Sequence, residues 1–446
     1  MTNDKTEDNI HVNRCALSFV IVNWSLFIAT FWYNPSVTPY VTRLTFHIAS
    51  MSKPLRILIL YADTGGGHRA TSQAVADGLR EHYGNAVEPV LFDGLRRYAP
   101  WPVSHLDDMY PWMSGLSKTW GDGWTALNQP DVARKFMRGW WPYVRTSAIR
   151  MAEEPCDAIV NVQPLYTYPV LWAMDHIGVR KPFITMVSDL IVVHALWCDP
   201  TTDRFLVPTD LSRLLALQNR IPEEKIGVVG LPIRLIFNTP PEPKPLVRAR
   251  LGLKDKQTVL LMGGGQGLGG IYDIAEAIGR SGLNVQLVVV AGRNKKLKEQ
   301  LDAANWPIDL KTYGFISEVH DVMNAADVLI TKAGPTTICE AFTRNLPIII
   351  SGYIPSQEDQ NAEYVTQSCA GVLAEKPNLI VDTLRQWLSD PILMAQMARN
   401  SGALARPRAA LDAAEEIYQI ATSQPIRYRH PQHEPLLNRI DRFLGT

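Results

Sequence analysis

Two stretches of this chain present the same order of features, and together they constrain the fold more than any other part of the sequence. Residues 55–61 are an apolar run, LRILILY, which ends in a turn with three glycines before apolar residues recur at helical spacing over residues 70–79. Residues 258–262, TVLLM, likewise end in a glycine-rich turn, and a helix is predicted over residues 271–279. Such runs are typical of parallel strands buried on both faces, and glycine lets the backbone approach a ligand closely. The repeat therefore predicts an α/β fold with two binding turns, each at the carboxyl end of a strand.

Further strand and helix candidates alternate along both halves of the chain. Strands are predicted over residues 87–92, 157–162, 182–188, 204–207, 225–229, 285–290, 328–331 and 346–350, and a helix over residues 165–176. Five prolines between residues 232 and 245 mark a hinge-like linker. At 446 residues the chain is too long for a single core. We expect an N-terminal extension (1–50), a first Rossmann-like domain (51–235), a linker (236–250), a second Rossmann-like domain (251–423) and a tail (424–446).

Charge and cysteine content exclude several classes of protein. Lysine plus arginine total 44, and aspartate plus glutamate also total 44, which argues against a nucleic-acid binder that works through a global basic field. The five cysteines are scattered and lack CxxC spacing, so they indicate neither a disulfide framework nor a zinc site. A reducing cytosol fits this cysteine usage best.

The segment from Ala16 to Tyr33 contains no charged residue and is barely long enough to span a membrane. Three interpretations are open: a single membrane anchor, a weak signal sequence, or an upstream extension of a protein that begins at Met51. Residues 1–14 are mixed in charge, unlike the basic start of a signal peptide, so the first and third interpretations are favoured equally.

His68 directly follows the three glycines of the first turn and is our candidate for a general base. Ligands bind at the carboxyl ends of strands in doubly wound folds, and histidine exchanges protons near neutral pH. A solvent-exposed loop histidine is the competing interpretation. Asp189 ends another predicted strand in the same layer as His68. Its carboxylate either orients His68 or shares its proton, or it caps the following turn.

Residues 94–150 have an unusual composition. They contain six of the twelve tryptophans and eight lysines and arginines against four aspartates. Aromatic rings beside basic side chains suit a membrane interface, where the rings lie at headgroup level and the cations meet anionic lipid. Core packing in an irregular helical insertion ranks second, and stacking on single-stranded nucleic acid a distant third. The candidates for lipid contact are Trp120, Trp124, Trp140, Trp141 and Arg138.

The stretch from Leu329 to Tyr353 combines a strand end, the turn KAGPTT, a helix and a second strand. A helix that begins at such a turn presents backbone N–H groups and two hydroxyls to an anion. Glu340 lies one helical turn after Thr336, where its carboxylate can accept hydrogen bonds from a sugar hydroxyl. An ordinary capped junction has the same pattern. In combination with the two glycine-rich turns and His68, the stretch predicts a nucleotide site.

The second glycine-rich turn also satisfies G-x-G-x-x-G through Gly265, Gly267 and Gly270, so a dinucleotide-binding domain is an alternative. The next strand ends near Arg293, where an NAD site requires Asp or Glu for the ribose. Arg293 is compatible only with NADP, and no cofactor-linked catalytic set follows. This alternative is the weaker one.

Several motifs, in order and at regular spacing between Lys53 and Ala421, resemble the monogalactosyldiacylglycerol synthase family, which includes bacterial diacylglycerol glucosyltransferases and is akin to the GlcNAc transferase of peptidoglycan lipid synthesis. These motifs are Gly65-Gly-Gly-His-Arg69, Val187-Ser-Asp-Leu190 with His194 and Trp197, Gly230-Leu-Pro-Ile-Arg234, Met262-Gly-Gly-Gly-Gln-Gly267, Gly314-Phe315, Lys332-Ala-Gly-Pro-Thr-Thr337 and Tyr353-Ile-Pro-Ser-Gln-Glu358. Any one of them is weak, but the series in register is specific.

The resemblance implies a GT-B architecture, in which two Rossmann-like domains face each other across a cleft. The first binds the acceptor and the second binds the UDP-sugar. It implies an inverting transfer of galactose or glucose from UDP-galactose or UDP-glucose to 1,2-diacylglycerol, with His68 as the general base, no metal and no cofactor besides the donor substrate. Helix N-termini and turn amides would stabilise the leaving UDP.

The same resemblance implies the site residues. Around the diphosphate they are Gly265, Gln266, Gly334, Pro335, Thr336 and Thr337; around uracil, ribose and hexose they are Phe315, Glu340, Gln357, Glu358 and Asn361. On the acceptor side we expect Gly66 and Gly67 beside the aromatic residues already named. Two residues depart from the family pattern, because Thr336 and Ser356 stand where glycine is usual.

We therefore expect a UDP-sugar, diacylglycerol and an anionic lipid surface as partners, and no nucleic acid. We expect the protein at the cytoplasmic face of a membrane, held peripherally or by one N-terminal anchor. The alternatives are transfer to another lipid acceptor, a UDP-sugar hydrolase or epimerase, and a non-catalytic nucleotide-sugar sensor. The choice between galactose and glucose, and the oligomeric state, stay open.

Overall fold

The computed structural model describes residues 53–63, 67–99, 104, 117–263 and 270–428. The expected N-terminal extension and most of the expected tail lie outside these ranges, as do Gly66, Gly265 and Gln266. The side chain of Trp120 is likewise outside the described part.

The first half of the chain builds a sheet of six parallel strands. In spatial order they are β2 (Val87–Asp93), β1 (Leu55–Tyr61), β3 (Ala158–Asn161), β5 (Phe183–Met186), β6 (Arg204–Val207) and β7 (Ile226–Val228). All strands predicted for this half are confirmed, with ends displaced by at most two residues. Pro89, which has no backbone N–H to donate, is tolerated because β2 lies at the edge of the sheet.

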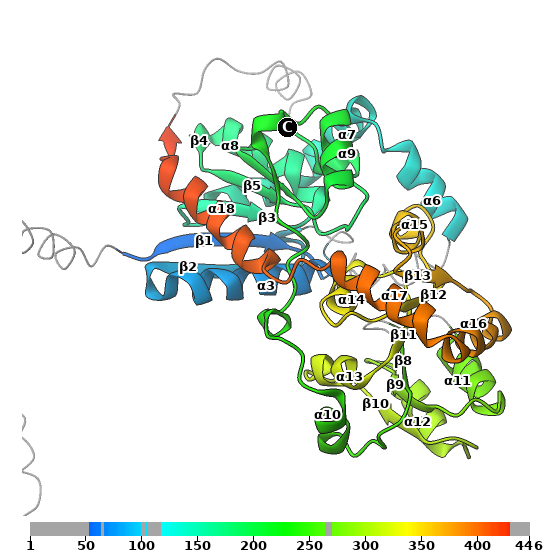
Figure 1. The fold of residues 1–446 in the computed structure, drawn as a ribbon. Coiled ribbons are helices and arrows are strands. Elements are labelled where there is room, and N and C mark those ends of the chain that lie inside the picture. Colours follow the sequence, from blue (N-terminus) through cyan, green and yellow to red (C-terminus); the bar gives the residue numbers. More distant parts are fainter. Residues whose placement is uncertain (1–52, 64–66, 100–103, 105–116, 264–269, 429–446) are drawn as a thin grey trace, which may run out of the picture. The chain divides into compact units, whose positions relative to one another are not determined.

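Helices cover both faces of this sheet (Figure 1). Ile57 and Ile59 of β1 pack on one face, against residues of α3, while Leu58 and Leu60 pack on the other, against residues of α7 and α8. This explains why β1 is apolar on both faces of its pleat. The helices of this half are α3 (Gly67–Tyr83), α4 (Gly94–Tyr98), α6 (Ser117–Ala126), α7 (Pro130–Glu153), α8 (Thr167–Ile177) and α9 (Asp210–Gln218).

The second half repeats the plan. Its parallel strands are, in spatial order, β10 (Leu310–Tyr313), β9 (Gln286–Val290), β8 (Thr258–Met262), β11 (Val328–Lys332), β12 (Ile348–Gly352) and β13 (Gly371–Leu373). Its helices are α10 (Lys244–Arg250), α11 (Ile271–Arg280), α12 (Lys295–Ala303), α13 (Val319–Ala325), α14 (Pro335–Phe342), α15 (Asp359–Gln367), α16 (Pro377–Ser389) and α17 (Pro391–Ala403). Alternate residues of β8 again enter two different core clusters.

The last helix among the described residues, α18 (Ala409–Ser423), returns to the first half (Figure 1). Ala413, Ala414 and Ile417 are fully buried in the same cluster as Ile57 and Ile59 of β1. The packing therefore differs from our expectation that residues 251–423 form one domain. Beyond α18, β14 (Arg427–Tyr428) pairs antiparallel with β4 (Val179–Arg180), which also belongs to the first half.

The aromatic segment forms the helices α6 and α7, and its tryptophans have different environments. Trp141 packs edge-on against Trp172, with ring centroids 5.8 Å apart, and Trp124 packs on His194 at 4.0 Å. Trp140 is 41% exposed, on the outer face of α7. Core packing, which we ranked second, therefore accounts for Trp124 and Trp141, whereas Trp140 remains available to a surface partner.

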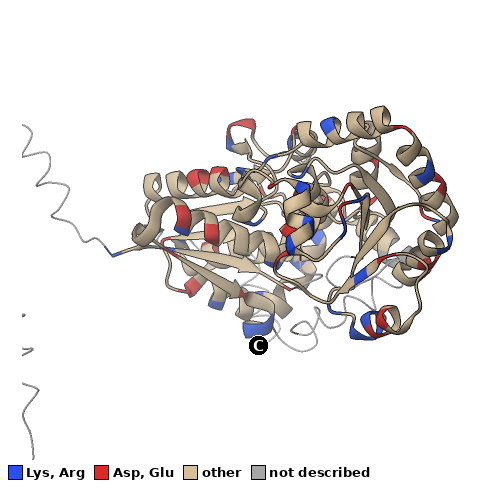
Figure 2. Cartoon of the chain, turned by 60° about the horizontal axis from the view of Figure 1, so that its bottom comes forward, with Lys and Arg blue, Asp and Glu red and all other residues tan. Residues whose placement is uncertain are grey.

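Acidic and basic residues are interspersed over the described elements, in keeping with the zero formal net charge (Figure 2). Among the helices that the structure describes, none has both the length and the apolar character needed to cross a bilayer. Residues 16–33, for which a membrane anchor was one of three interpretations, lie outside the described residues.

Candidate active site

His68 lies in the first turn of α3, directly after β1, at the carboxyl edge of the first sheet. Its Nδ1 is 2.7 Å from Ser188 Oγ, and its ring centroid is 6.1 Å from that of Trp197. Ser188 follows β5 closely, so two strand ends of one sheet bring these residues together, as doubly wound topology requires. Gly67, one residue earlier, has open space where a Cβ would stand.

The surroundings of His68 keep its imidazole neutral. Burial lowers the pKa of His68 to about 4, and a hydrogen bond with the backbone of Val162 and the charge of Asp63 only partly oppose that effect. At neutral pH the ring therefore has one unprotonated nitrogen and can accept a proton. A general base needs this property.

Asp189 is not the hydrogen-bonding partner that the structure gives to His68. Ser188 has that place, while Asp189 Oδ2 accepts a hydrogen bond from Trp197 Nε1 at 3.0 Å. Burial raises the pKa of Asp189 to about 6; the Trp197 hydrogen bond opposes the rise and the charge of Glu358 adds to it. Sequence reasoning missed Ser188, although a hydroxyl at the strand end in the same layer as His68 was a usable signal.

The turn before α14 leaves backbone donors uncapped. Gly334 is the N-cap residue and provides no side-chain acceptor, and Pro335 occupies the first helical position. The backbone N–H groups of Thr336 and Thr337 therefore receive no side-chain cap, and they lie at the positive end of the helix dipole. Such a helix start attracts an anion.

A buried amide lies directly behind this turn. Asn361 on α15 is 2% exposed and donates through Nδ2 to the carbonyl of Ala333 at 3.0 Å. Its Oδ1 is buried and has no hydrogen-bond partner in the described structure. Buried polar atoms are nearly always paired, so Asn361 Oδ1 is an acceptor whose hydrogen-bonding capacity is unused beside this turn.

Glu340, one turn into α14, is buried and forms an ion pair with Arg234, whose Nη2 lies 3.4 Å from Glu340 Oε1. Burial raises the pKa of Glu340 to about 7, while Arg234 and Arg344 act in the opposite direction. Arg234 also donates through Nη1 to the carbonyl of Ser317 at 2.5 Å. The arginine of the GLPIR motif, for which the sequence indicated no role, thus connects Glu340 to the loop that follows Phe315.

Phe315 presents an exposed aromatic ring on that loop. Its side chain is 65% exposed, and the guanidinium of Arg293 lies over the ring at 5.2 Å. An exposed ring beside an arginine offers a planar surface for a base. Arg293, the residue compatible with an NADP site, therefore contacts the ring of Phe315 instead.

The side chain of Glu358 stabilises the turn between Ile354 and Glu358. Glu358 forms an ion pair with Lys332 through Oε1, and its Oε2 accepts a hydrogen bond from the backbone N–H of Ile354 at 3.0 Å. Gln357 lies on the same turn. Ser356 has a left-handed backbone, with φ of +66°, which explains why glycine is favoured at this position.

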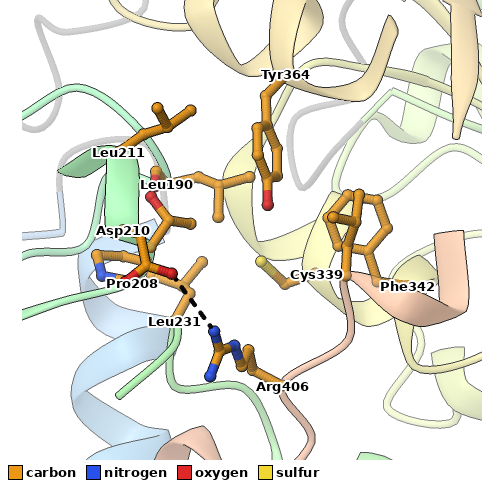
Figure 3. A pocket seen from close by; sticks show the side chains of 11 residues that line it. Leu190, Pro208, Asp210, Leu211, Leu231, Cys339, Phe342, Tyr364 and Arg406 are labelled. Atoms are coloured by element: carbon orange, nitrogen blue, oxygen red, sulfur yellow. Dashed lines mark hydrogen bonds and ion pairs between the residues drawn. The ribbon is translucent and has the colours of Figure 1, made fainter. Parts of the chain in front are cut away.

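A separate pocket of about 210 Å³ lies where residues of the two halves meet (Figure 3). Asp210 and Arg406 form an ion pair 4.0 Å apart in its wall. Cys339 also faces it, and burial raises the pKa of that thiol. None of the predicted site residues lines this pocket, so the pocket is distinct from the candidate site.

Within the described ranges, the side chains of His, Cys, Asp and Glu form no group of three or more that could hold a metal ion. Metal independence remains a prediction.

Comparison with known proteins places the chain in a family. The profile of the family described as "Monogalactosyldiacylglycerol (MGDG) synthase" matches residues 68–233, and that of the "Glycosyltransferase family 28 C-terminal domain" matches residues 258–417. A probable monogalactosyldiacylglycerol synthase of Glycine max is 32% identical over 391 residues, which cover 82% of this chain and 72% of that protein. Monogalactosyldiacylglycerol synthase 2 of Arabidopsis thaliana is 32% identical over 378 residues, covering 82% and 81%.

Solved structures show the same fold at low identity. MurG of Acinetobacter baumannii aligns with a TM-score of 0.53 at 17% identity, over 82% of this chain and 100% of that chain. The S. aureus MnaA–UDP co-structure aligns with a TM-score of 0.52 at 13% identity, over 88% and 97%. The predicted GT-B architecture is confirmed by two Rossmann-like parallel sheets and these neighbours. By the extent and identity of its relatives, the chain belongs to the monogalactosyldiacylglycerol synthase family.

Proposed function

We propose that this chain is an inverting glycosyltransferase that moves galactose from UDP-galactose to the 3-hydroxyl of 1,2-diacylglycerol. The observation that carries the proposal is the neutral, half-buried His68 at the carboxyl edge of the first sheet, hydrogen-bonded to Ser188, in a chain whose relatives are named monogalactosyldiacylglycerol synthases. Galactose is chosen over glucose because of those names. UDP-glucose is the competing donor.

In the proposed reaction one bond forms and one breaks. The hydroxyl oxygen of the acceptor bonds to the anomeric carbon, while the bond between that carbon and the β-phosphate oxygen of UDP breaks. The hydroxyl proton passes to the unprotonated ring nitrogen of His68. Attack from the face opposite the leaving UDP inverts the anomeric carbon. Ser188 holds the ring through Nδ1, 2.7 Å from its Oγ.

The second half supplies the donor site in this proposal. The uncapped N–H groups of Thr336 and Thr337 take the diphosphate and stabilise the charge that develops on leaving UDP. Glu340 accepts hydrogen bonds from ribose hydroxyls, and Phe315 lies at the uracil. Gln357, Glu358 and Asn361 face the hexose; the unpaired Oδ1 of Asn361 accepts a hydrogen bond from one of its hydroxyls.

The protein reaches its lipid substrate by peripheral docking through α7. Val132, Trp140 and Tyr143 are 38%, 41% and 43% exposed and recur at helical spacing, so they form one stripe. Arg134 and Arg138 are exposed on the same helix. An amphipathic helix with aromatic rings and basic side chains binds at the interface of an anionic bilayer.

The test is a reconstitution with purified protein and liposomes that contain diacylglycerol. UDP release would be measured with UDP-galactose and with UDP-glucose, and the lipid product identified by mass spectrometry. We expect UDP and galactosyldiacylglycerol in equal amounts. Release of UDP that does not need the lipid indicates a hydrolase, and binding of donor without turnover indicates a sensor. Turnover only with UDP-glucose rejects the proposed donor.

A further inference from the structure

Ser356 adopts a backbone conformation that L-amino acids avoid. It is one of only a few non-glycine residues with positive φ among those described, at +66°, and it lies in the middle of the Ile354–Glu358 turn. The turn is closed by the N–H of Glu358, which donates to the carbonyl of Ile354 at 2.8 Å. Such strain persists where surrounding contacts fix the conformation. The contacts of Ser356 therefore matter.

Those contacts come from α6, a helix of the first half. Thr125 Oγ1 donates to Ser356 Oγ at 3.3 Å. Gly121, one turn earlier on α6, is buried beneath the same turn. A Cβ at Gly121 would lie 3.0 Å from Ser356 Oγ and 3.7 Å from the carbonyl oxygen of Pro355. Because Gly121 has no side chain, α6 can approach the Ile354–Glu358 turn this closely.

The far side of α6 is anchored to the first half. The rings of Trp124 and His194 lie 4.0 Å apart, and His194 Nε2 donates to the carbonyl of Trp124 at 2.9 Å. His194 is fully buried, and its Nδ1 accepts from the N–H of Leu196 at 3.1 Å. Immediately beyond α6, Asn128 Oδ1 accepts from the N–H of Ala195 at 2.9 Å. One side of α6 is therefore attached to the first half, and the other side contacts the Ile354–Glu358 turn.

We infer that α6 positions the hexose-binding turn, and that Gly121, Thr125 and Ser356 are positioning residues for the donor sugar. The inference rests on the proposed function, because it assumes that Gln357 and Glu358 on this turn face the hexose. Beyond the proposed function, the inference states that α6, a helix of the first half, determines the positions of the Gln357 and Glu358 side chains. The hexose affinity of the second half then depends on a helix of the first half.

Two glycines of α6 allow a matched test. Gly121→Ala adds a methyl group 3.0 Å from Ser356 Oγ, whereas Gly123→Ala, two residues further along the same helix, meets nothing within 4 Å. Both changes raise the helix propensity of α6 equally. Any difference between the two variants therefore reports contact with the turn and not the stability of the helix.

The readout is the binding of UDP and of UDP-galactose, measured separately by calorimetry. UDP lacks the hexose, so the ratio of the two affinities isolates the contribution of the hexose turn. We expect Gly121→Ala to weaken UDP-galactose binding by about three- to tenfold, the scale of one misplaced hydrogen bond, and to leave UDP binding unchanged. Gly123→Ala is expected to behave as the parent with both ligands.

Hydroxyl variants give a second measurement. Thr125→Val removes the donor and is expected to raise the KM for UDP-galactose by about two- to fivefold with little change in kcat, while Thr125→Ser is expected to restore the parent value. If Gly121→Ala and Thr125→Val both match the parent, the inference is wrong. Equal weakening of UDP and UDP-galactose also overturns it. If the parent itself binds no UDP, the proposed function fails instead.

Discussion

His68 Nδ1 and Ser188 Oγ lie 2.7 Å apart, although the two residues are 120 positions apart in the chain. One follows β1 and the other follows β5, and neither strand lies next to the other in the sheet. This hydrogen bond and the one with the Val162 backbone together fix the plane of the imidazole. The contact between His68 and Ser188 is the first place to test the proposed mechanism.

Replacement of His68 by alanine removes the proposed base. We expect kcat to fall by about 10²–10⁴-fold, the usual contribution of a positioned general base, with UDP affinity unchanged. Single-turnover UDP release from liposome-bound protein measures the first quantity, and calorimetry the second. A His68→Ala variant with parental turnover would show that another group takes the proton.

Ser188→Ala should lower kcat by about two- to tenfold, because the imidazole loses one hydrogen bond but keeps that with the Val162 backbone. Ser188→Thr retains the hydroxyl and should recover most of the rate. In the His68→Ala background the Ser188→Ala change should have no further effect, since the residue acts only through the imidazole. Additive losses in the double variant would contradict this role.

The stability of the protein should depend on pH through Asp189. Its pKa is about 6 in the folded protein against an ordinary 3.8, so the folded state binds more protons than the unfolded state between these values. The stabilisation from protonated Asp189 is therefore fully present below about pH 4 and is lost as pH rises through about 6. Asp189→Asn cannot ionise and keeps an acceptor for Trp197.

The free energy of unfolding of Asp189→Asn, relative to the parent, should accordingly rise by up to about 3 kcal/mol from pH 4 to pH 7. Urea denaturation at several pH values in that window measures it. If the difference in unfolding free energy between the two proteins is the same at every pH, burial does not raise the pKa of Asp189.

Arg234 should control donor affinity in a pH-dependent way. Arg234 lowers the pKa of Glu340, which burial raises to about 7, so removing the arginine leaves more of the carboxyl protonated at neutral pH. We expect Arg234→Met to weaken UDP binding by about fivefold near pH 7. Part of the lost affinity should return near pH 9, where the Glu340 carboxyl ionises without the arginine. Arg234→Lys, which keeps the charge, should show a smaller loss. A loss that is identical at both pH values would assign Arg234 to loop support through Ser317 alone.

The adjacent residues Trp140 and Trp141 should respond differently. Trp140→Ala removes an exposed ring from the α7 stripe and should weaken binding to anionic liposomes by about tenfold without changing stability. Trp141→Ala removes the ring that packs on Trp172 and should cost about 2 kcal/mol of stability. Liposome sedimentation and thermal unfolding distinguish the two effects. If Trp140→Ala leaves sedimentation unchanged, α7 is not the docking helix.

The central strands could be predicted because burial on both faces forces continuous apolar runs, as in β1 and β8. The edge strands β10 and β13 could not, because one is only half-buried along its length, LKTY, and the other spans three residues. A half-buried or very short strand contributes little apolar surface, so its sequence signal is weak, although the edge strands β2 and β7 of the first sheet were predicted.

The candidate site divides in a similar way. His68 and the turn before α14 were predictable because glycine turns after strands have local sequence signals. The partners were not, because Ser188 and Arg234 reach their sites across 120 and 106 residues of chain. The left-handed φ of Ser356 has no signature in a serine side chain. Long-range contacts and unusual backbone angles arise only when the fold is complete.

The return of α18 to the first sheet has a consequence for biosynthesis. Ala413, Ala414 and Ile417 fill the core beside β1, and α18 approaches α3 so closely that a Cβ on Gly78 would lie 2.3 Å from the carbonyl oxygen of Ala410. While the ribosome is still translating the second half, β1 and α3 lack this covering and expose apolar surface. The core of the first half is therefore complete only after α18 has been synthesised, and α18 follows all six strands of the second sheet in the sequence.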